Sequence, residues 1–272
     1  MKTSFTTLGC PDWSLADIAK NAKAYGYDGV ELRTADDGNH LNPNASPAEV
    51  AKVAGIFKDA GIPVISVMGY AKFAATDAKE LAANADSLRH QIAIAKTLKA
   101  PLIRSYCGSF PKGADRETII KTIIESYKPL AAEAAAAGVT LGLETHDDWC
   151  SGDLIMRVVE GAGAKGIGVV YDIYNCVLAN VEPWEKTYAR IKGRIAYCHL
   201  KDGWTDAAGK TTYVQLGAGD LPLYDILRRF KADGYSGVFS FEWEKKWHSE
   251  LAGPEIVFPH YPHKLRAAWA SV

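Results

Sequence analysis

Short apolar runs alternate with longer helical segments along the whole chain, and this alternation limits the possible folds more than any other feature. Each run has the length of a buried strand, and the segments between runs carry apolar residues at helical spacing. The predicted strands are 4–10, 29–32, 63–68, 101–106, 139–144, 166–172, 195–200 and 237–242. The predicted helices are 14–25, 46–60, 78–98, 116–137, 153–162, 183–190 and 223–233, with a short helix ending the tail. We therefore predict an α/β protein with one domain over residues 1–272, a single (β/α)₈ TIM barrel.

Glycine turns support this interpretation, because several predicted strands follow the helix-ending glycines of segments such as AYGYDGV and AAGVTL. The alternative is a doubly wound open sheet. That fold would place a glycine-rich phosphate-binding loop after its first strand, and no GxGxxG motif follows the first predicted strand here.

Composition and charge exclude several functional classes. With 48% hydrophobic residues and a net charge of -1, the chain can build a large core and has no bias toward nucleic acid or anionic membranes. Its five cysteines form no CxxC pair, which predicts buried free thiols. The start lacks the apolar region of a signal peptide, and no run approaches the roughly 18 apolar residues of a membrane span. We expect a cytoplasmic protein that binds neither nucleic acid nor membrane.

Four polar residues stand at the carboxyl ends of the last four predicted strands: Glu144, Asp172, His199 and Glu242. In a TIM barrel these ends meet at one face, where active sites lie. Taken singly, each residue could belong to a buried ion pair or a helix cap. Three carboxylates and one imidazole in succession instead favour one divalent cation of the oxygen-preferring kind, Mn²⁺ first, with Mg²⁺ or Co²⁺ possible.

The motifs LGLETH, VVYDIYN, YCHLKDG, QLGAGDLP and FEW resemble those of the xylose-isomerase-like barrels in the sugar phosphate isomerase/epimerase family, which includes ketose 3-epimerases and inosose dehydratases. The resemblance covers nearly the whole chain. It implies that Glu144, Asp172, His199 and Glu242 bind the metal. It also implies that Glu144 and Glu242 are the catalytic residues, which exchange protons with a sugar from opposite faces beside its carbonyl, through a metal-bound enediolate.

Two positions differ from the epimerase pattern. Asn175 stands where the epimerases have a sugar-binding histidine, and Ala218 stands where many relatives have a glutamate. The segment 244–248 adds further acid and base groups. These departures leave open a related chemistry, in which a carbon–oxygen lyase eliminates a group from a keto-sugar, a 3-keto-glycoside or a keto-inositol.

Several residues near the quartet are candidates for substrate binding. His146 and Lys201 each follow a ligand candidate by two residues, so strand alternation places them on the same face. Arg104 lies inside a buried strand and needs an anionic partner, and Glu31 has a similar position in the second strand. Asn175 and Trp149 complete the predicted set. Each of these residues has a structural alternative as an ion-pair partner, a loop residue or part of the core.

Three other functional hypotheses compete with the isomerase. The first is the lyase. The second is an endonuclease acting at abasic DNA sites, which the net charge of -1 disfavours. The third is a non-catalytic sugar-binding or partner subunit. The predicted partner is a small sugar or keto-sugar, and a homo-oligomer is possible.

Overall fold

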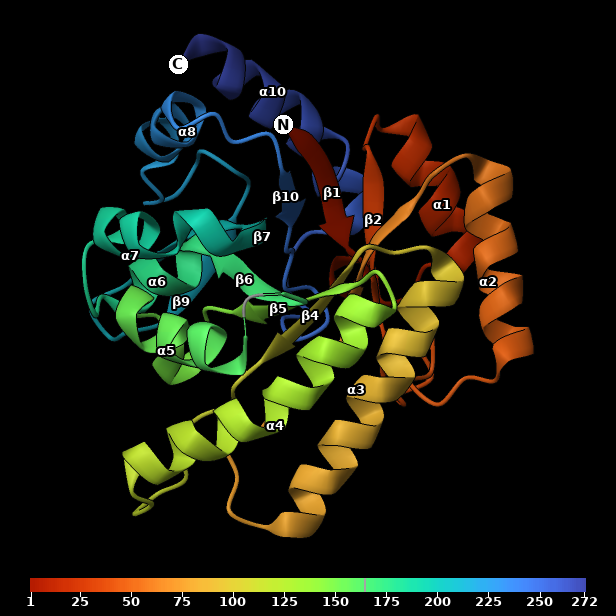
Figure 1. Ribbon diagram of the computed structural model, residues 1–272. Helices are drawn as coiled ribbons and strands as arrows, with labels where there is room; N and C mark the ends of the chain where they lie inside the picture. Colours follow the sequence, from red (N-terminus) through yellow and green to blue (C-terminus); the bar gives the residue numbers. More distant parts are fainter. Residues whose placement is uncertain (164) are drawn as a thin grey trace.

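Eight parallel strands close into a barrel in the computed structural model of this chain, which describes residues 1–163 and 165–272 (Figure 1). The order around the barrel is β1-β10-β7-β6-β5-β4-β3-β2. Strand β1 closes the ring by pairing with β10 in the register Lys2↔Val238. The barrel strands are β1 (Lys2–Thr6), β2 (Gly29–Arg33), β3 (Val64–Met68), β4 (Leu102–Tyr106), β5 (Thr140–Glu144), β6 (Ile167–Asp172), β7 (Ile195–Leu200) and β10 (Val238–Phe241). The predicted (β/α)₈ barrel is confirmed, and one domain over residues 1–272 stays a prediction.

Helices connect the strands and surround the barrel (Figure 1). They are α1 (Leu15–Ala24), α2 (Pro47–Ala60), α3 (Ala78–Leu98), α4 (Arg116–Ala136), α5 (Gly152–Ala162), α6 (Ile173–Ala179), α7 (Trp184–Ile191), α8 (Leu223–Ala232), α9 (Pro254–Val257) and α10 (His260–Ser271). Short 3₁₀ turns lie at Thr7–Gly9, Asp147–Trp149 and Lys192–Arg194. Local sequence sets the ends of α2: Ser46 and Glu49 form a capping box, and Gly61 ends the helix at φ 70°.

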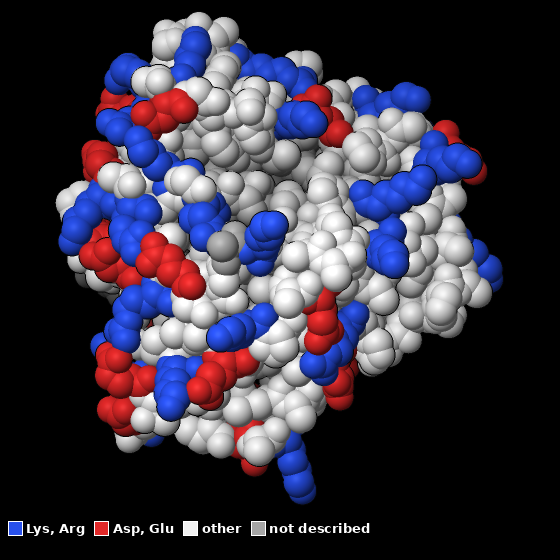
Figure 2. Space-filling view, viewed as in Figure 1, with Lys and Arg blue, Asp and Glu red and all other residues white. Residues whose placement is uncertain are grey.

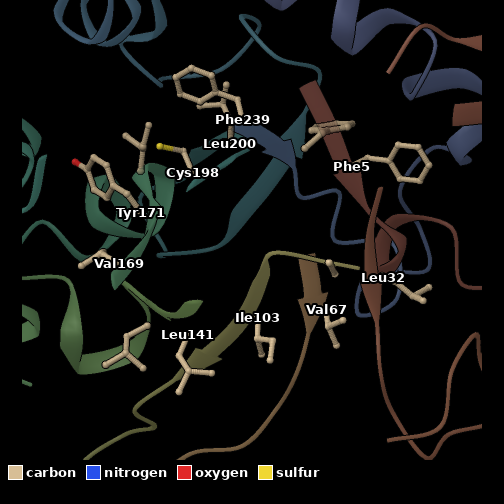
Figure 3. Close-up of a cluster of buried hydrophobic side chains, with 14 of the residues drawn as sticks. Phe5, Leu32, Val67, Ile103, Leu141, Val169, Tyr171, Cys198, Leu200 and Phe239 are labelled. Atoms are coloured by element: carbon tan, nitrogen blue, oxygen red, sulfur yellow. The ribbon is translucent and has the colours of Figure 1, made fainter. Parts of the chain in front are cut away.

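The largest apolar core lies between the outer face of the barrel and the helices. Figure 3 shows strand side chains arranged around the barrel and pointing away from its centre, where they meet the helices. Among them are Phe5, Leu32, Val67, Ile103, Leu141, Val169, Tyr171, Leu200 and Phe239, all of them buried. Because alternate residues point outward, the residues between them point into the barrel.

A smaller apolar cluster, Val170, Tyr197 and Val238, is packed with partly buried Ile65, Leu102 and Ala196. Val170, Tyr197, Val238 and Leu102 alternate with the outward-facing residues of their strands, so they fill the barrel interior. Polar residues take over toward the carboxyl ends of the strands, and the buried polar groups of the barrel include Glu31, Arg104 and His199. The barrel therefore presents a buried, charged layer at the end where its strand–helix loops begin.

Three segments differ from the sequence prediction. The first strand ends at Thr6 rather than residue 10, because a 3₁₀ turn capped by Thr6 follows it. Helix α6 was not predicted; it begins directly after β6, because the Asp172 side chain caps it. The long loop after β7 contains a two-stranded hairpin of β8 (Asp202–Thr205) and β9 (Thr211–Val214).

On the face shown in Figure 2, lysine and arginine side chains are interspersed with aspartate and glutamate. Such mixing agrees with the net charge of -1 over the sequence. Within the described residues, none of the helices is long and apolar enough to cross a membrane.

Candidate metal centre

The four strand-end residues meet at one point. Glu144 and Asp172 end β5 and β6, His199 lies near the end of β7, and Glu242 directly follows β10. Each offers one ligand atom, these atoms lie within 4.8 Å of one another, and all four residues are buried. The structure therefore brings together the whole predicted ligand set.

His199 lies between carboxylates on both of its ring nitrogens. Its Nδ1 atom is 2.6 Å from Glu144 Oε1 and 3.3 Å from Glu242 Oε1. Its Nε2 atom is 2.9 Å from Glu31 Oε2, on the side away from the quartet. The hydroxyls of Tyr197 and Ser240 donate to Glu31 over 2.5 and 2.7 Å. Glu31 is thus held in place and fixes the orientation of the imidazole ring, as carboxylates behind metal-binding histidines do.

Asp172 uses its two oxygens differently. Oδ1 accepts a hydrogen bond of 2.8 Å from the backbone N–H of Asn175, which caps helix α6. Oδ2 lies 2.9 Å from the Lys201 Nζ atom. Because the cap fixes the carboxylate plane, Oδ2 is the oxygen available to a cation.

Two buried cations accompany the carboxylates. Arg104 donates to a single oxygen of Glu144, Oε2, from Nε at 2.9 Å and from Nη2, while its Nη1 donates to the Gly69 carbonyl at 2.9 Å. The Lys201 ammonium contacts Glu242 at 2.5 Å and Glu244 at 2.8 Å. Buried charges of this kind are stable only when paired and hydrogen-bonded.

These neighbours shift the pKa values of the carboxylates. Burial alone would raise the pKa of Glu144, but Arg104 and His199 outweigh it and hold the pKa well below its usual range. Burial is likewise outweighed at Glu242, where Lys201 and His199 lower the pKa. Burial dominates at Asp172 and, with the neighbouring carboxylates, raises its pKa. Two of the quartet's carboxylates are therefore ionised at neutral pH without help from a metal.

The donor set fits a divalent cation. The carboxylates around the quartet are those of buried Glu31, Glu144, Asp172 and Glu242 and of half-buried Glu244, and their partners in fixed positive charge are Arg104 and Lys201. Carboxylates thus outnumber fixed cations, and a divalent ion at the quartet would offset the excess. The His199 Nδ1 proton would have to leave, since a metal-bound imidazole is neutral.

A cavity of about 440 Å³ reaches the quartet at Glu242. Four of the five residues predicted to bind substrate line it: Arg104, His146, Asn175 and Lys201. The fifth, Trp149, does not. It is fully buried, its indole N–H donates to the Gly108 carbonyl over 2.7 Å, and its ring stacks on Phe110. We therefore leave Trp149 out of the proposed site.

Sequence reasoning named Glu31 as a candidate of the same kind as Arg104, but it did not foresee the contact with His199, which joins two strands far apart in sequence. It gave no role in the site to three other residues. Tyr213 reaches the cavity from the β8–β9 hairpin, and Glu244 and Trp247 reach it from the loop after β10. The acid- and base-rich segment 244–248 was the only sequence signal for the last two.

Residues 19–258 match the family model described as xylose isomerase-like TIM barrel. The chain belongs to this family. The predicted resemblance is therefore confirmed over most of the chain. No curated protein sequence matches it.

Solved structures with the same architecture include several members with different activities. An L-ribulose 3-epimerase superposes with a TM-score of 0.81 at 17% identity, covering 99% of this chain and 95% of that one. The IolI protein, which carries a zinc atom, gives 0.81 at 18% identity, covering 100% and 97%. A probable 3-DHS dehydratase from Bacillus anthracis gives 0.79 at 15% identity, covering 98% and 99%. At such identities the likeness establishes the fold, and the activity has to be argued from the site.

Proposed function

We propose that this chain is a divalent-metal-dependent sugar isomerase or epimerase that removes a proton beside a carbonyl group. The proposal rests on the positions of Glu144 and Glu242. Glu144 at the end of β5 and Glu242 directly after β10 bring ligand atoms within 4.8 Å of each other from strands that β6 and β7 separate in the barrel, and Glu242 lines the cavity beside them. A sugar carbon between the two carboxylates can lose a proton to one and receive a proton from the other.

The surrounding residues support such proton transfer. Arg104 and Lys201 keep Glu144 and Glu242 ionised, so that each carboxylate can accept a proton at neutral pH. We assign His146 and Asn175, which line the cavity, to hydrogen bonds with substrate hydroxyl groups. The catalytic pair is thus held by fixed charges, and the polar wall beside it orients the sugar.

Glu144, Asp172, His199 and Glu242 would together hold one divalent cation, for which Mn²⁺ is our first candidate and Mg²⁺ or Co²⁺ the alternatives. Bound there, the cation would stabilise negative charge on the substrate's carbonyl oxygen. The IolI protein binds zinc on the same fold, which supports a metal centre here without identifying the metal.

Glu244 favours a second candidate, a carbon–oxygen lyase acting on a keto-sugar, a 3-keto-glycoside or a keto-inositol. Burial raises the pKa of Glu244, and Glu242 adds to this effect against the opposing charge of Lys201. A protonated Glu244 can donate its proton to a leaving oxygen after a carboxylate removes the proton beside the carbonyl. The carbon–oxygen bond at the next carbon then breaks, and a conjugated enone forms.

Solvent proton exchange tests the proposal. The Mn²⁺-loaded protein is incubated in D₂O with ketohexoses and 3-keto-glucosides, and deuterium incorporation is followed by NMR. We expect exchange in the wild type, and a loss of about 10²- to 10⁴-fold in Glu144→Gln and Glu242→Gln. Asp153→Asn, an exposed acid on α5 that does not line the cavity, is the control and should retain exchange. Retained exchange in both active-site variants would contradict the proposal.

Ultraviolet absorbance in the same incubations separates the two candidates, since elimination builds a conjugated enone and epimerisation does not. A protein that neither binds Mn²⁺ nor exchanges protons would instead be the non-catalytic sugar-binding or partner subunit. A homo-oligomer and a cytoplasmic location stay predictions.

A further inference from the structure

A second cavity adjoins the one over the quartet. We call it the side chamber; its volume is about 620 Å³. The residues that line it are Arg33, Thr34, Ala35, Asp36, Asp37, Pro43, Tyr70, Ala71, Asn84, Ser87, Gln91, Lys246 and Trp247. They come from the loops after β2 and β3, from helix α3 and from the segment after β10. The proposed chemistry leaves this chamber without a role.

The side chamber and the quartet cavity share two walls, Tyr70 and Trp247. The Gly69 backbone lies between them as well: its carbonyl accepts from Arg104 of the quartet cavity, and the Gln91 side chain of the chamber packs against it. The two cavities are therefore neighbours, with Tyr70 and Trp247 at their common boundary.

The shared aromatic walls are held in place. The Arg33 guanidinium carbon lies 5.2 Å from the ring centre of Tyr70 and 5.6 Å from that of Trp247. Its Nε atom also donates to the Tyr70 hydroxyl over 2.6 Å. Trp247 nevertheless keeps 56% of its surface exposed. A large aromatic side chain fixed by a cation and open at a cavity is a surface on which a ring can stack.

The charges of the chamber cancel. Arg33 forms a bidentate pair with Asp37, and Lys246 contacts the same carboxylate at 2.9 Å. Lys246 also donates to the Asn39 side chain over 2.7 Å. Asp36 adds a further acid to the lining. Both basic groups are thus already paired, so the chamber offers no excess positive charge to a phosphate group.

Neutral polar groups accompany the aromatic walls. Gln91 is 1% exposed, and its Oε1 atom has no hydrogen-bond partner among the residues that the structure describes. Ser87 lies on the same helix, one turn earlier, at a partly exposed position. An acceptor left unpaired in a buried position favours a ligand that can donate to it, such as one carrying a hydroxyl group.

The volumes of the two cavities also fit a ligand of two rings. Sites that hold a whole small ligand are on the order of 300–1,000 Å³. The quartet cavity, at about 440 Å³, already falls in that range and suffices for one sugar ring. The side chamber is larger than the quartet cavity, and a single ring at the quartet would leave it empty.

We propose that the side chamber binds a neutral ring joined to the reacting sugar, so that the substrate is a glycoside or disaccharide rather than a free or phosphorylated monosaccharide. The ring, a second sugar or an aryl group, stacks on Trp247 and Tyr70, since sugars and aryl groups both present an apolar face. This inference rests on the proposed function, because it places the reacting sugar at the quartet.

Binding of non-reacting sugars tests the chamber separately from the reaction, since a ligand without a carbonyl group cannot be turned over. Dissociation constants of the Mn²⁺-loaded protein are measured by NMR titration for methyl β-glucoside, phenyl β-glucoside, methyl β-cellobioside and methyl β-glucoside 6-phosphate, whose anomeric centres are all blocked. We expect both two-ring ligands, phenyl β-glucoside and methyl β-cellobioside, to bind at least about tenfold more tightly than methyl β-glucoside, and the 6-phosphate to gain nothing.

Two variants test whether the higher affinity for two-ring ligands comes from the side chamber. Trp247→Ala removes the stacking surface, and Ser87→Trp fills the chamber from α3; each should abolish the gain. Ser87 lines only the side chamber, so Ser87→Trp should also leave the affinity for methyl β-glucoside unchanged. Trp204→Ala is the matched control, because Trp204 is 44% exposed on the β8–β9 hairpin and lines neither cavity. Thermal melts check that each variant folds.

Equal affinity for methyl β-glucoside and either two-ring ligand, tightest binding of the 6-phosphate, or a gain that survives both variants would overturn the proposal. So would a failure of all four sugars to bind. Failure of the proposed function has a different signature, namely the absence of solvent proton exchange with a normal preference for two-ring ligands.

Discussion

The imidazole of His199 joins Glu31 to Glu144: its Nε2 atom lies 2.9 Å from the first carboxylate and its Nδ1 atom 2.6 Å from the second. Glu31 comes from β2 and Glu144 from β5, so the contact runs across the barrel interior. The contact with His199 gives the buried Glu31 carboxylate a hydrogen-bond partner beneath the quartet. It sets which nitrogen of His199 faces the proposed metal.

Replacing Glu31 should weaken the metal centre without touching a ligand. In Glu31→Gln the carboxamide no longer fixes the His199 tautomer, and loss of such a carboxylate typically lowers metal affinity about 10- to 100-fold. Mn²⁺ affinity by calorimetry and the visible spectrum of the Co²⁺ form are the readouts. Glu125→Gln, at an exposed position on α4, is the control. Unchanged affinity and spectrum in Glu31→Gln would show that Glu31 has only a packing role.

Metal binding should release a proton. Burial opposes protonation of His199, but Glu31, Glu242 and Glu144 outweigh it and raise the pKa well above its ordinary value. The metal-free imidazole is therefore protonated at neutral pH and must lose its proton to become a ligand. Mn²⁺ affinity should then rise about tenfold per pH unit below that pKa. Calorimetry in buffers of different ionisation enthalpy measures the protons released; a value of zero at neutral pH would contradict this protonation state.

Lys201 should be important for stability when no metal is bound. Replacing it in Lys201→Met leaves buried Asp172 and Glu242 without their cation, and breaking a buried pair costs about 3–5 kcal/mol. Urea unfolding gives this difference. Lys121→Met is the control, since Lys121 is exposed and should cost less than about 0.5 kcal/mol. Mn²⁺ should stabilise Lys201→Met more than the wild type, and equal stabilisation would argue against binding at the quartet.

His40 makes the fold sensitive to acid. Burial lowers the pKa of His40 to about 4, below its ordinary value of 6.5. The unfolded chain therefore binds a proton that the folded chain excludes, and stability falls as the pH drops from about 6.5 toward 4. In His40→Asn, whose side chain tolerates the positive φ of 56°, unfolding free energy should depend less on pH over that window. Exposed His90→Asn is the control. Identical pH profiles for His40→Asn and the wild type would refute this origin.

The barrel and the quartet could be predicted because both depend on local sequence. Each strand is an apolar run of its own, and in a closed parallel barrel the carboxyl ends of all strands meet. That rule is enough to bring Glu144 to Asp172 and His199. A separate rule, that a buried guanidinium needs an anion, predicted that Arg104 lies beside a carboxylate.

The remaining residues depend on geometry that the sequence does not reveal. The contact between Glu31 and His199 follows from how the strands are staggered around the barrel. Trp149 turns into the core because Asp147 adopts a positive φ of 50° and the Gly108 carbonyl accepts the indole N–H. Trp247 reaches both cavities from an irregular loop, whose path no periodicity describes.

Equilibrium dialysis with Mn²⁺ tests the central claim most directly, namely that Glu144, Asp172, His199 and Glu242 form one metal site. The wild type should bind one ion per chain, and Asp172→Asn should weaken binding severely while the exposed control Asp153→Asn leaves it unchanged. Absence of Mn²⁺ binding in the wild type, or unchanged binding in Asp172→Asn, would contradict the account.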